Sequence, residues 1–169
     1  MNEPAFQTAL GQAEAIRTKR ISAAEMLEYY LERVQRFNPQ LNAIVQTCPE
    51  SARKHAEKAD QAIARGEVWG PLHGVPVTIK DTLEVAGMPC TSGSPGLKNH
   101  MPEKNAETVQ SYIDAGAVVF GKTNVPLYGG DLQSFNKVYG QTNNPWNENR
   151  TPGGSSGGAA AALTAGLCG

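Results

Sequence analysis

The chain has 169 residues, of which 40% are hydrophobic and 18% are charged, and its formal net charge is -1 at pH 7. These values are typical of one globular domain, and a nearly neutral charge does not favour nucleic acid or a membrane surface as a partner. No apolar run approaches the ~20 residues that span a bilayer, and the N-terminus lacks the apolar core of a signal peptide. The three cysteines are far apart and form no CxxC or Cys/His cluster, so we expect a protein of the reducing cytoplasm without a disulfide framework or a zinc site.

The first part of the chain is expected to be mainly helical. Ser22 and Glu25 have the spacing of a capping box, and apolar residues follow at helical spacing until Asn38-Pro39, where we expect the helix to end. A second helix is expected from Pro49 to a stop at Gly66. The short run "NAIVQT" between the two helices is a strand candidate.

From residue 70 the sequence changes to short apolar runs separated by glycine and proline. The runs "GVPVTIKD" and "GAVVFGKT" are typical of strands, and "AETVQSYIDAG" between them is typical of a helix. A strand, a helix and a strand in succession form a crossover unit, so the predicted fold class is α/β, with a mixed β-sheet covered by helices. We expect a helical N-terminal segment over about residues 1–66 and a sheet core over 67–169. The polar, glycine-rich stretch 126–152 is long for a connection and is expected to form part of a site.

Three short motifs match known patterns but lie in the wrong context. Residues 116–123 satisfy the phosphate-loop pattern GxxxxGK[ST], yet "AVVF" within them is itself the expected strand, so we predict no nucleotide site. Residues 153–157 fit the GxSxG nucleophile elbow, but no strand is expected before them and all three histidines of the chain precede them. Residues 51–54 match SxxK without its companion motifs and are better explained as a solvated helix face.

Lys80 is the first residue to which we assign chemistry. In "GVPVTIKD" the residues Val75, Val77 and Ile79 alternate onto one strand face, which places Thr78 and Lys80 on the other. A solvated strand end is the ordinary alternative for a lysine, but the flanking glycines and prolines and the expected internal position of the strand argue against it. A lysine withdrawn from water favours its neutral form, which is a base.

The stretch "GGSSGG" at residues 153–158 is the second such feature. Its composition alone would fit a flexible linker, but Thr151-Pro152 stiffens its entry and the helix-forming "AAAALTAGL" follows at once. Glycines packed before a helix start indicate unusual backbone dihedrals, and serine hydroxyls held there could relay protons.

Five stretches together resemble the amidase signature family over about residues 20–169: "GPLHGVPVTIKD", "AGMPCTSGSP", "GAVVFGKTNVP", "QTNNPWN" and "RTPGGSSGGAAAAL". The resemblance implies a large mixed sheet wrapped by helices and a catalytic Ser–Ser–Lys triad. It identifies Lys80 as the catalytic lysine and Ser155 as the bridging serine, which follows a cis peptide bond and also contributes to substrate binding. It places the backbone of Gly129 and Gly130 beside the substrate, although an ordinary turn is an equally good explanation for these glycines.

The family's acylating serine lies further along the chain, in a Gly-Gly-Ser turn that also supplies the oxyanion hole, whereas this sequence ends at Gly169. The resemblance therefore implies a single partial domain of an amidase that cleaves a carboxamide C–N bond, inactive by itself, with a small-molecule amide as substrate and no metal or organic cofactor. Alternatives are the amidase subunit of a tRNA-dependent amidotransferase and a non-catalytic fragment or binding module. A homodimer or a partner subunit is compatible with either enzyme, and no direct contact with nucleic acid or a membrane is expected.

Two geometric expectations follow from these assignments. Ser155 Oγ should lie within hydrogen-bonding distance of Lys80 Nζ, and the Gly154–Ser155 peptide bond should be cis. Asp81 and Asp131 could support the site, but a capping or surface role is the expectation for each.

Overall fold

A computed structural model describes residues 3–169 of the chain. The centre of the fold is a three-stranded sheet with the order β1-β3-β2, in which β3 pairs antiparallel with β1 and parallel with β2. A separate hairpin is formed by β4 and β5. The longer elements are α1 (Ala9–Arg17), α2 (Ala23–Leu41), β1 (Ile44–Thr47), α3 (Pro49–Ala64), β2 (Pro76–Lys80), α4 (Glu107–Asp114), β3 (Val118–Thr123) and α5 (Gly157–Thr164). The shorter ones are η1 (Pro4–Phe6), η2 (Pro95–Leu97), η3 (Leu127–Gly129), β4 (Phe135–Asn136) and β5 (Gly140–Gln141).

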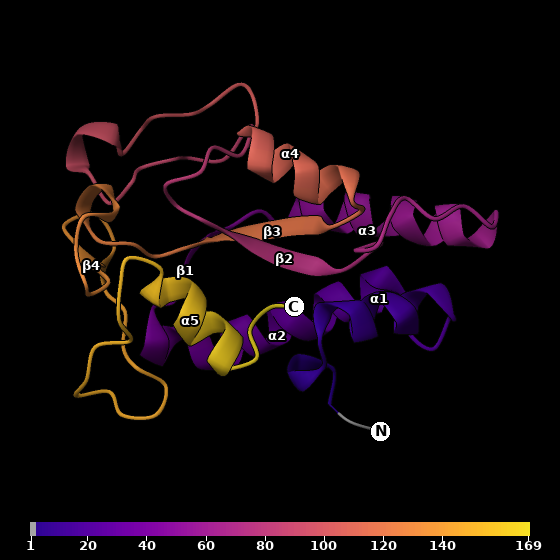
Figure 1. The fold of residues 1–169 in the computed structure, drawn as a ribbon, viewed down its shortest axis with the longest axis horizontal. Helices are drawn as coiled ribbons and strands as arrows, with labels where there is room; N and C mark the ends of the chain where they lie inside the picture. The colour runs from indigo at the N-terminus through magenta and orange to yellow at the C-terminus, as the bar shows by residue number, and fades with distance from the viewer. Residues whose placement is uncertain (1–2) are drawn as a thin grey trace.

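The sheet is covered by helices on both sides. Figure 1 shows α4 on one side of β2 and β3, and α1, α2 and α5 on the other. Val118 and Phe120 of β3 belong to the main core with Met26 and Tyr30 of α2 and with small residues of α3 and α5. On the opposite side Val109 of α4 packs with apolar residues of β2 and of the loop after it. The predicted fold class, α/β with a mixed sheet covered by helices, is confirmed.

Local sequence signals explain most of the element boundaries. The capping box is present, because Ser22 Oγ accepts from the Glu25 amide and Glu25 accepts from the Ser22 amide. Helix α3 begins at Pro49 and ends just before Gly66, which has φ +79°. Helix α1 was not predicted from the sequence; Thr8 caps it by accepting from the Gly11 amide at 3.1 Å.

Helix α2 runs past the predicted stop at Asn38-Pro39 and ends at Leu41. Leu41 is buried in the main core, so the last turn gains apolar contacts. Asn38 accepts from the Ala43 and Ile44 amides, which orders the chain directly after the helix. These contacts offset the loss of a donor at Pro39.

Within residues 3–169 the first strand of the crossover, β2, is an edge strand and not the internal strand that was predicted. In the described part of the chain β2 pairs along its length with β3 alone, and β3 is the central strand. At the other edge of β2 the Gly169 amide donates to the Pro76 carbonyl at 3.1 Å. Across residues 3–169 no helix has both the length and the apolar character needed to cross a membrane.

Candidate active site

Lys80 is the last residue of β2, and its side chain lies on the face of the strand that the alternation predicted. Val75, Val77 and Ile79 are buried, whereas Thr78 and Lys80 are half-buried. The lysine thus emerges at the end of the strand toward the start of α5.

Ser155 is held by a tightly packed glycine turn just before α5. Gly153 has φ +90°, and a Cβ atom on Gly154 would lie 2.4 Å from the Gln133 carbonyl oxygen and 2.6 Å from that of Asp131. Gly154 therefore allows the turn to approach the backbone of residues 131–133 more closely than any other residue could. The Gly154–Ser155 peptide bond is cis, as predicted.

The lysine and the serines meet across 75 residues of sequence. Lys80 Nζ donates to Ser155 Oγ at 2.7 Å, which confirms the predicted contact. It also donates to Ser156 Oγ at 3.0 Å, a contact that was not predicted from the sequence. Ser156 is the N-cap residue of α5, but its hydroxyl caps no helix amide and is free to face the lysine. The doubled serine in the motif was the available signal for this second contact.

Gly129 lies beside this pair. Its own φ is +69°, and a Cβ atom built on it would lie 3.8 Å from Ser155 Oγ. Gly130 follows with an ordinary φ of -95°, and the nearest atom to a Cβ there would be the Leu127 carbonyl oxygen at 3.5 Å. The structure thus brings Gly129 to the serine and leaves Gly130 exposed at the next position. Their roles in substrate binding stay predictions.

A groove of about 560 Å³ adjoins this loop, and Gly130 and Tyr128 form part of its wall. Tyr128 has a left-handed backbone, with φ +53°, and its hydroxyl is 2.9 Å from that of Ser94 on the facing loop. The stretch 126–152, which was expected to form part of a site, supplies most of the other lining residues: Pro126, Leu127, Asp131, Gln133, Phe135, Asn136 and Lys137.

The residue after Lys80 is fully buried, which corrects the expected surface role of Asp81. Its carboxylate accepts from Thr91 Oγ1 at 2.5 Å and forms an ion pair with Lys122 at 3.3 Å. Burial raises the pKa of the neighbouring Cys90 thiol and of the Tyr139 phenol, so both groups stay uncharged at neutral pH. Asp131, in contrast, is exposed and accepts from the Leu132 amide, as expected for a surface turn.

The competing motifs lie where their sequence context indicated. The phosphate-loop pattern runs through β3, and its lysine, Lys122, is fully buried and paired with Asp81. The histidines occupy other places: His73 is buried beside Ala59 and Trp69, His55 stacks edge-on against Trp69, and His100 contacts Glu84. Residues 3–169 contain no cluster of three or more histidine, cysteine or acidic side chains that could hold a metal ion.

Comparison with known proteins identifies the family and the fold. Residues 25–169 match the family model described as Amidase. The chain belongs to the amidase signature family. Among solved structures, a bacterial aryl acylamidase of the amidase signature family superimposes with a TM-score of 0.92 at 32% identity, covering 98% of this chain and 35% of that one. The 6-aminohexanoate cyclic dimer hydrolase superimposes with a TM-score of 0.88 at 38% identity, covering 97% of this chain and 33% of that one.

Two curated relatives show the range of the family. One, a component of the glutamyl-tRNA(Gln) amidotransferase of Dehalococcoides mccartyi (strain CBDB1), is 40% identical over 150 residues, which are 89% of this chain and 31% of that protein. The indoleacetamide hydrolase of Bradyrhizobium diazoefficiens is 41% identical over 165 residues, which are 97% of this chain and 32% of that protein. This chain therefore spans about a third of the length of these relatives.

Proposed function

We propose that this chain supplies the lysine and the bridging serine of an enzyme that cleaves a carboxamide C–N bond. The observation that carries the proposal is the 2.7 Å contact between Lys80 Nζ and Ser155 Oγ, which joins the end of β2 to the turn before α5 across 75 residues of sequence. Membership of the amidase signature family supports the same assignment. The position of Gly129 beside Ser155 is compatible with an amide bound over the serine.

In the proposed mechanism Lys80 accepts a proton through Ser155 from a nucleophilic serine. That serine forms a bond to the amide carbonyl carbon, and the carbonyl oxygen becomes an oxyanion. When the intermediate collapses, the C–N bond breaks and the relay returns the proton to the leaving nitrogen, which departs as ammonia or an amine. Water activated through the same relay then hydrolyses the acyl ester and releases the acid.

We further propose that the nucleophilic serine and the oxyanion donors are supplied by sequence outside residues 1–169. Support comes from the share of the relatives that the chain spans, about a third. Residues 1–169 then form a single partial domain, with a helical segment over about 1–66 and a sheet core over 67–169. Loss of a single oxyanion donor can reduce a rate by about 10²–10³, so a protein lacking both elements should show no turnover.

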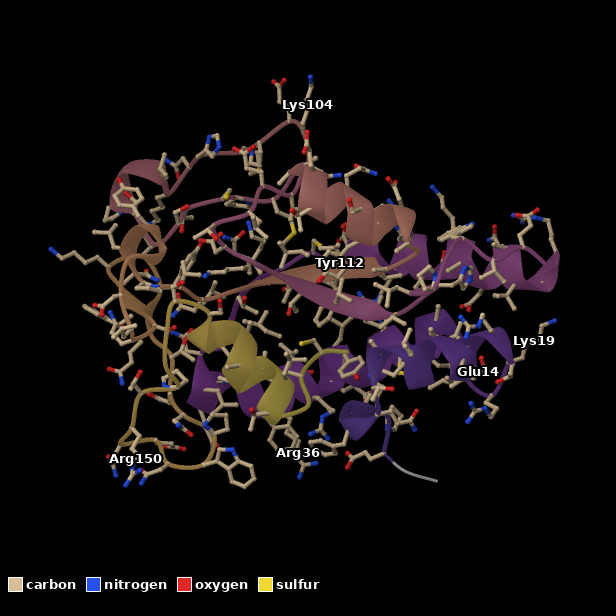
Figure 2. The ribbon with its side chains drawn as sticks, viewed as in Figure 1. Glu14, Lys19, Arg36, Lys104, Tyr112 and Arg150 are labelled. Atoms are coloured by element: carbon tan, nitrogen blue, oxygen red, sulfur yellow. The ribbon has the colours of Figure 1, made fainter. Side chains whose placement is uncertain are left out.

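The test compares residues 1–169 with a version extended by the downstream segment of the same gene, measuring ammonia release from a panel of simple amides. We expect turnover by the extended protein, its loss in Lys80→Ala and in Ser155→Ala, and no turnover by residues 1–169. A Lys19→Ala variant, altered at an exposed lysine on the far side of the fold, serves as the matched control (Figure 2). Turnover by residues 1–169 that disappears in Ser155→Ala would show that Ser155 is itself the nucleophile and would refute the assigned roles.

A second candidate is the amidase component of an amidotransferase, favoured by the relative that belongs to such an enzyme. In that case the extended protein should release ammonia efficiently only with a partner subunit present. Adding candidate partner subunits to the same assay separates the two enzymes. A protein that neither turns over amides nor gains activity with a partner would instead be a binding module. We also propose a cytoplasmic location, because all three cysteines are free thiols. A homodimer and a complex with a partner subunit are the two assemblies compatible with the proposal.

A further inference from the structure

Lys122 is a buried charged residue for which the proposed reaction has no use. Its side chain has no exposed surface, and it shares a buried ion pair with Asp81 at 3.3 Å. Its Nζ also donates to the carbonyls of Leu83 at 2.9 Å and Pro89 at 3.3 Å. Taking two charges out of water is unfavourable, and a buried pair often stabilises a fold no more than apolar side chains would. Stability alone is therefore a poor explanation for this arrangement.

The ion pair lies next to Lys80, because Asp81 follows Lys80 in the chain and Lys122 is opposite Ile79 on the neighbouring strand. In the parallel pairing of β2 and β3, Lys122 is opposite Ile79 and Thr123 is opposite Lys80. Neighbouring residues of a strand point to opposite faces, so Lys122 and Lys80 lie on opposite faces of the sheet. Lys122 thus contacts the end of β2 through Asp81 on one side of the sheet, while Lys80 contacts Ser155 and Ser156 on the other. The Asp81 amide completes the attachment by donating to the Thr123 carbonyl at 3.1 Å.

The same ion pair holds the loop that leads to Gly129. The Asp81 carboxylate accepts from Thr91, and the Asp81 carbonyl accepts from the Ser92 amide at 3.1 Å. The Ser92 carbonyl in turn accepts from the Tyr128 amide at 2.7 Å, immediately before Gly129. A series of hydrogen bonds therefore joins Lys122 to the backbone directly after Lys80 and, through Ser92, to Tyr128, the residue before Gly129.

We propose that Lys122 is a positioning residue that sets the location of Lys80 relative to Ser155. Its ammonium contacts the Leu83 and Pro89 carbonyls and the Asp81 carboxylate, and these contacts fix the conformation of residues 81–89, which follow β2. The consequence for catalysis rests on the proposed function, but the positioning itself does not. Its test therefore begins with a measurement on residues 1–169 that needs no turnover.

The measurement is the rate at which the Lys80 amine is acetylated by acetic anhydride, normalised to exposed Lys104, with peptide mass spectrometry as readout (Figure 2). In Lys122→Met we expect the normalised Lys80 rate to rise at least about fivefold, because a displaced amine loses its hydrogen bonds to the two serines. The double variant Ser155→Ala/Ser156→Ala should raise the rate to a similar extent. Lys98→Met, altered at another exposed lysine, should leave it unchanged.

A second variant separates positioning from simple stabilisation. Lys122→Met leaves Asp81 buried without its cation, so we pair it with Asp81→Asn, which removes both charges and should restore the unfolding temperature. Methionine still cannot donate to the Leu83 and Pro89 carbonyls, so the Lys80 rate should stay high in the double variant. A return to the native rate together with the unfolding temperature would overturn the proposal, as would an unchanged rate in folded Lys122→Met.

In the extended enzyme the same double variant should lower kcat by about 100-fold with little change in KM, the effect expected of a displacement near 1 Å. Absence of turnover in the unmutated extended protein would refute the proposed function while leaving the acetylation result to decide the positioning. Unchanged acetylation with intact turnover would refute the positioning alone.

Discussion

Gly158, in the first turn of α5, offers a test in which two general rules predict opposite signs. Replacing glycine by alanine within a helix ordinarily stabilises a protein by up to about 1 kcal/mol. A Cβ atom on Gly158, however, would lie 2.4 Å from the Asn124 nitrogen and 2.5 Å from its carbonyl oxygen. Nonbonded heavy atoms ordinarily approach to about 3.5–4.0 Å, so the clash amounts to roughly 1 Å against backbone atoms.

Asn124 cannot yield easily to relieve this clash. Its amide donates to the Ala43 carbonyl at 2.9 Å, and its side chain donates to Thr142 Oγ1 and accepts from Asn136. An extra methyl group in a packed interior typically costs about 1–3 kcal/mol, and rigid backbone neighbours place Gly158→Ala at the upper end. After subtracting the helix-propensity gain, we expect a net loss of about 2 kcal/mol in the free energy of unfolding. For a domain of this size that loss lowers the unfolding temperature by roughly 4–8 °C.

The assay is thermal and urea unfolding of residues 1–169 followed by circular dichroism. The matched control is Ala160→Gly, at an exposed position of the same helix, which should lose up to about 1 kcal/mol through propensity alone. Gly158→Ala should therefore be the less stable of the two variants, although it adds a better helix former. An unfolding temperature at or above that of the unmutated protein would show that α5 does not pack on Asn124 as described.

Three further changes should alter stability in ways that the same unfolding assay can measure. His73→Gln should flatten the pH dependence of the free energy of unfolding, because burial lowers the pKa of His73 in the folded protein. The stability that neutral His73 contributes is complete above about pH 6.5 and is lost as the pH falls from that value toward the lower pKa of the folded state. The slope is at most about 1.4 kcal/mol per pH unit. Equal slopes for both proteins between pH 7 and 5 would contradict this. Ser22→Ala should cost about 1 kcal/mol through loss of the capping box, whereas Ser111→Ala, at an exposed helix position, should have little effect. Arg33→Met should cost about 1.5–3 kcal/mol, because Arg33 donates to the Ala165 and Gly166 carbonyls at the end of α5, and Arg33→Lys should cost less; equal losses would argue against these bonds.

The spacing of apolar residues, together with capping residues, prolines and glycines, predicted most of the helices and strands correctly. The capping box and apolar stripe of α2, the Pro49 start and Gly66 stop of α3, and the alternation in β2 are local signals, and each has its expected counterpart in the structure. Helix α1 was missed because its residues form only a weak stripe of small side chains. The stop at Pro39 was wrong because burial of Leu41, a tertiary contact, outweighs the local effect of proline.

The candidate site was predictable only as far as its residues stand in recognisable motifs. Lys80 and the serines of residues 153–158 were singled out from the local sequence, and the resemblance assigned the roles of Lys80 and Ser155 and predicted their contact. The partner of Asp81 could not be found in this way, because the pairing of Asp81 with Lys122 depends on the parallel register of β2 and β3. Nothing in the local sequence fixes that register, so a residue expected at the surface proved to be fully buried.

The register also explains how two segments so far apart in the sequence hold a lysine and a serine in contact. Lys80 is opposite Thr123 at the end of β3, and the next residue, Asn124, is the one on which Gly158 packs. The strand that carries the lysine and the helix that follows the serine are therefore placed by adjacent residues of one chain segment. A side chain at position 158 would move α5 away from this segment, and loss of Lys122 would free the end of β2 from it. Both changes act on the distance between Lys80 Nζ and Ser155 Oγ without touching either atom, which is why glycine at 158 and a buried lysine at 122 belong to the architecture of the site.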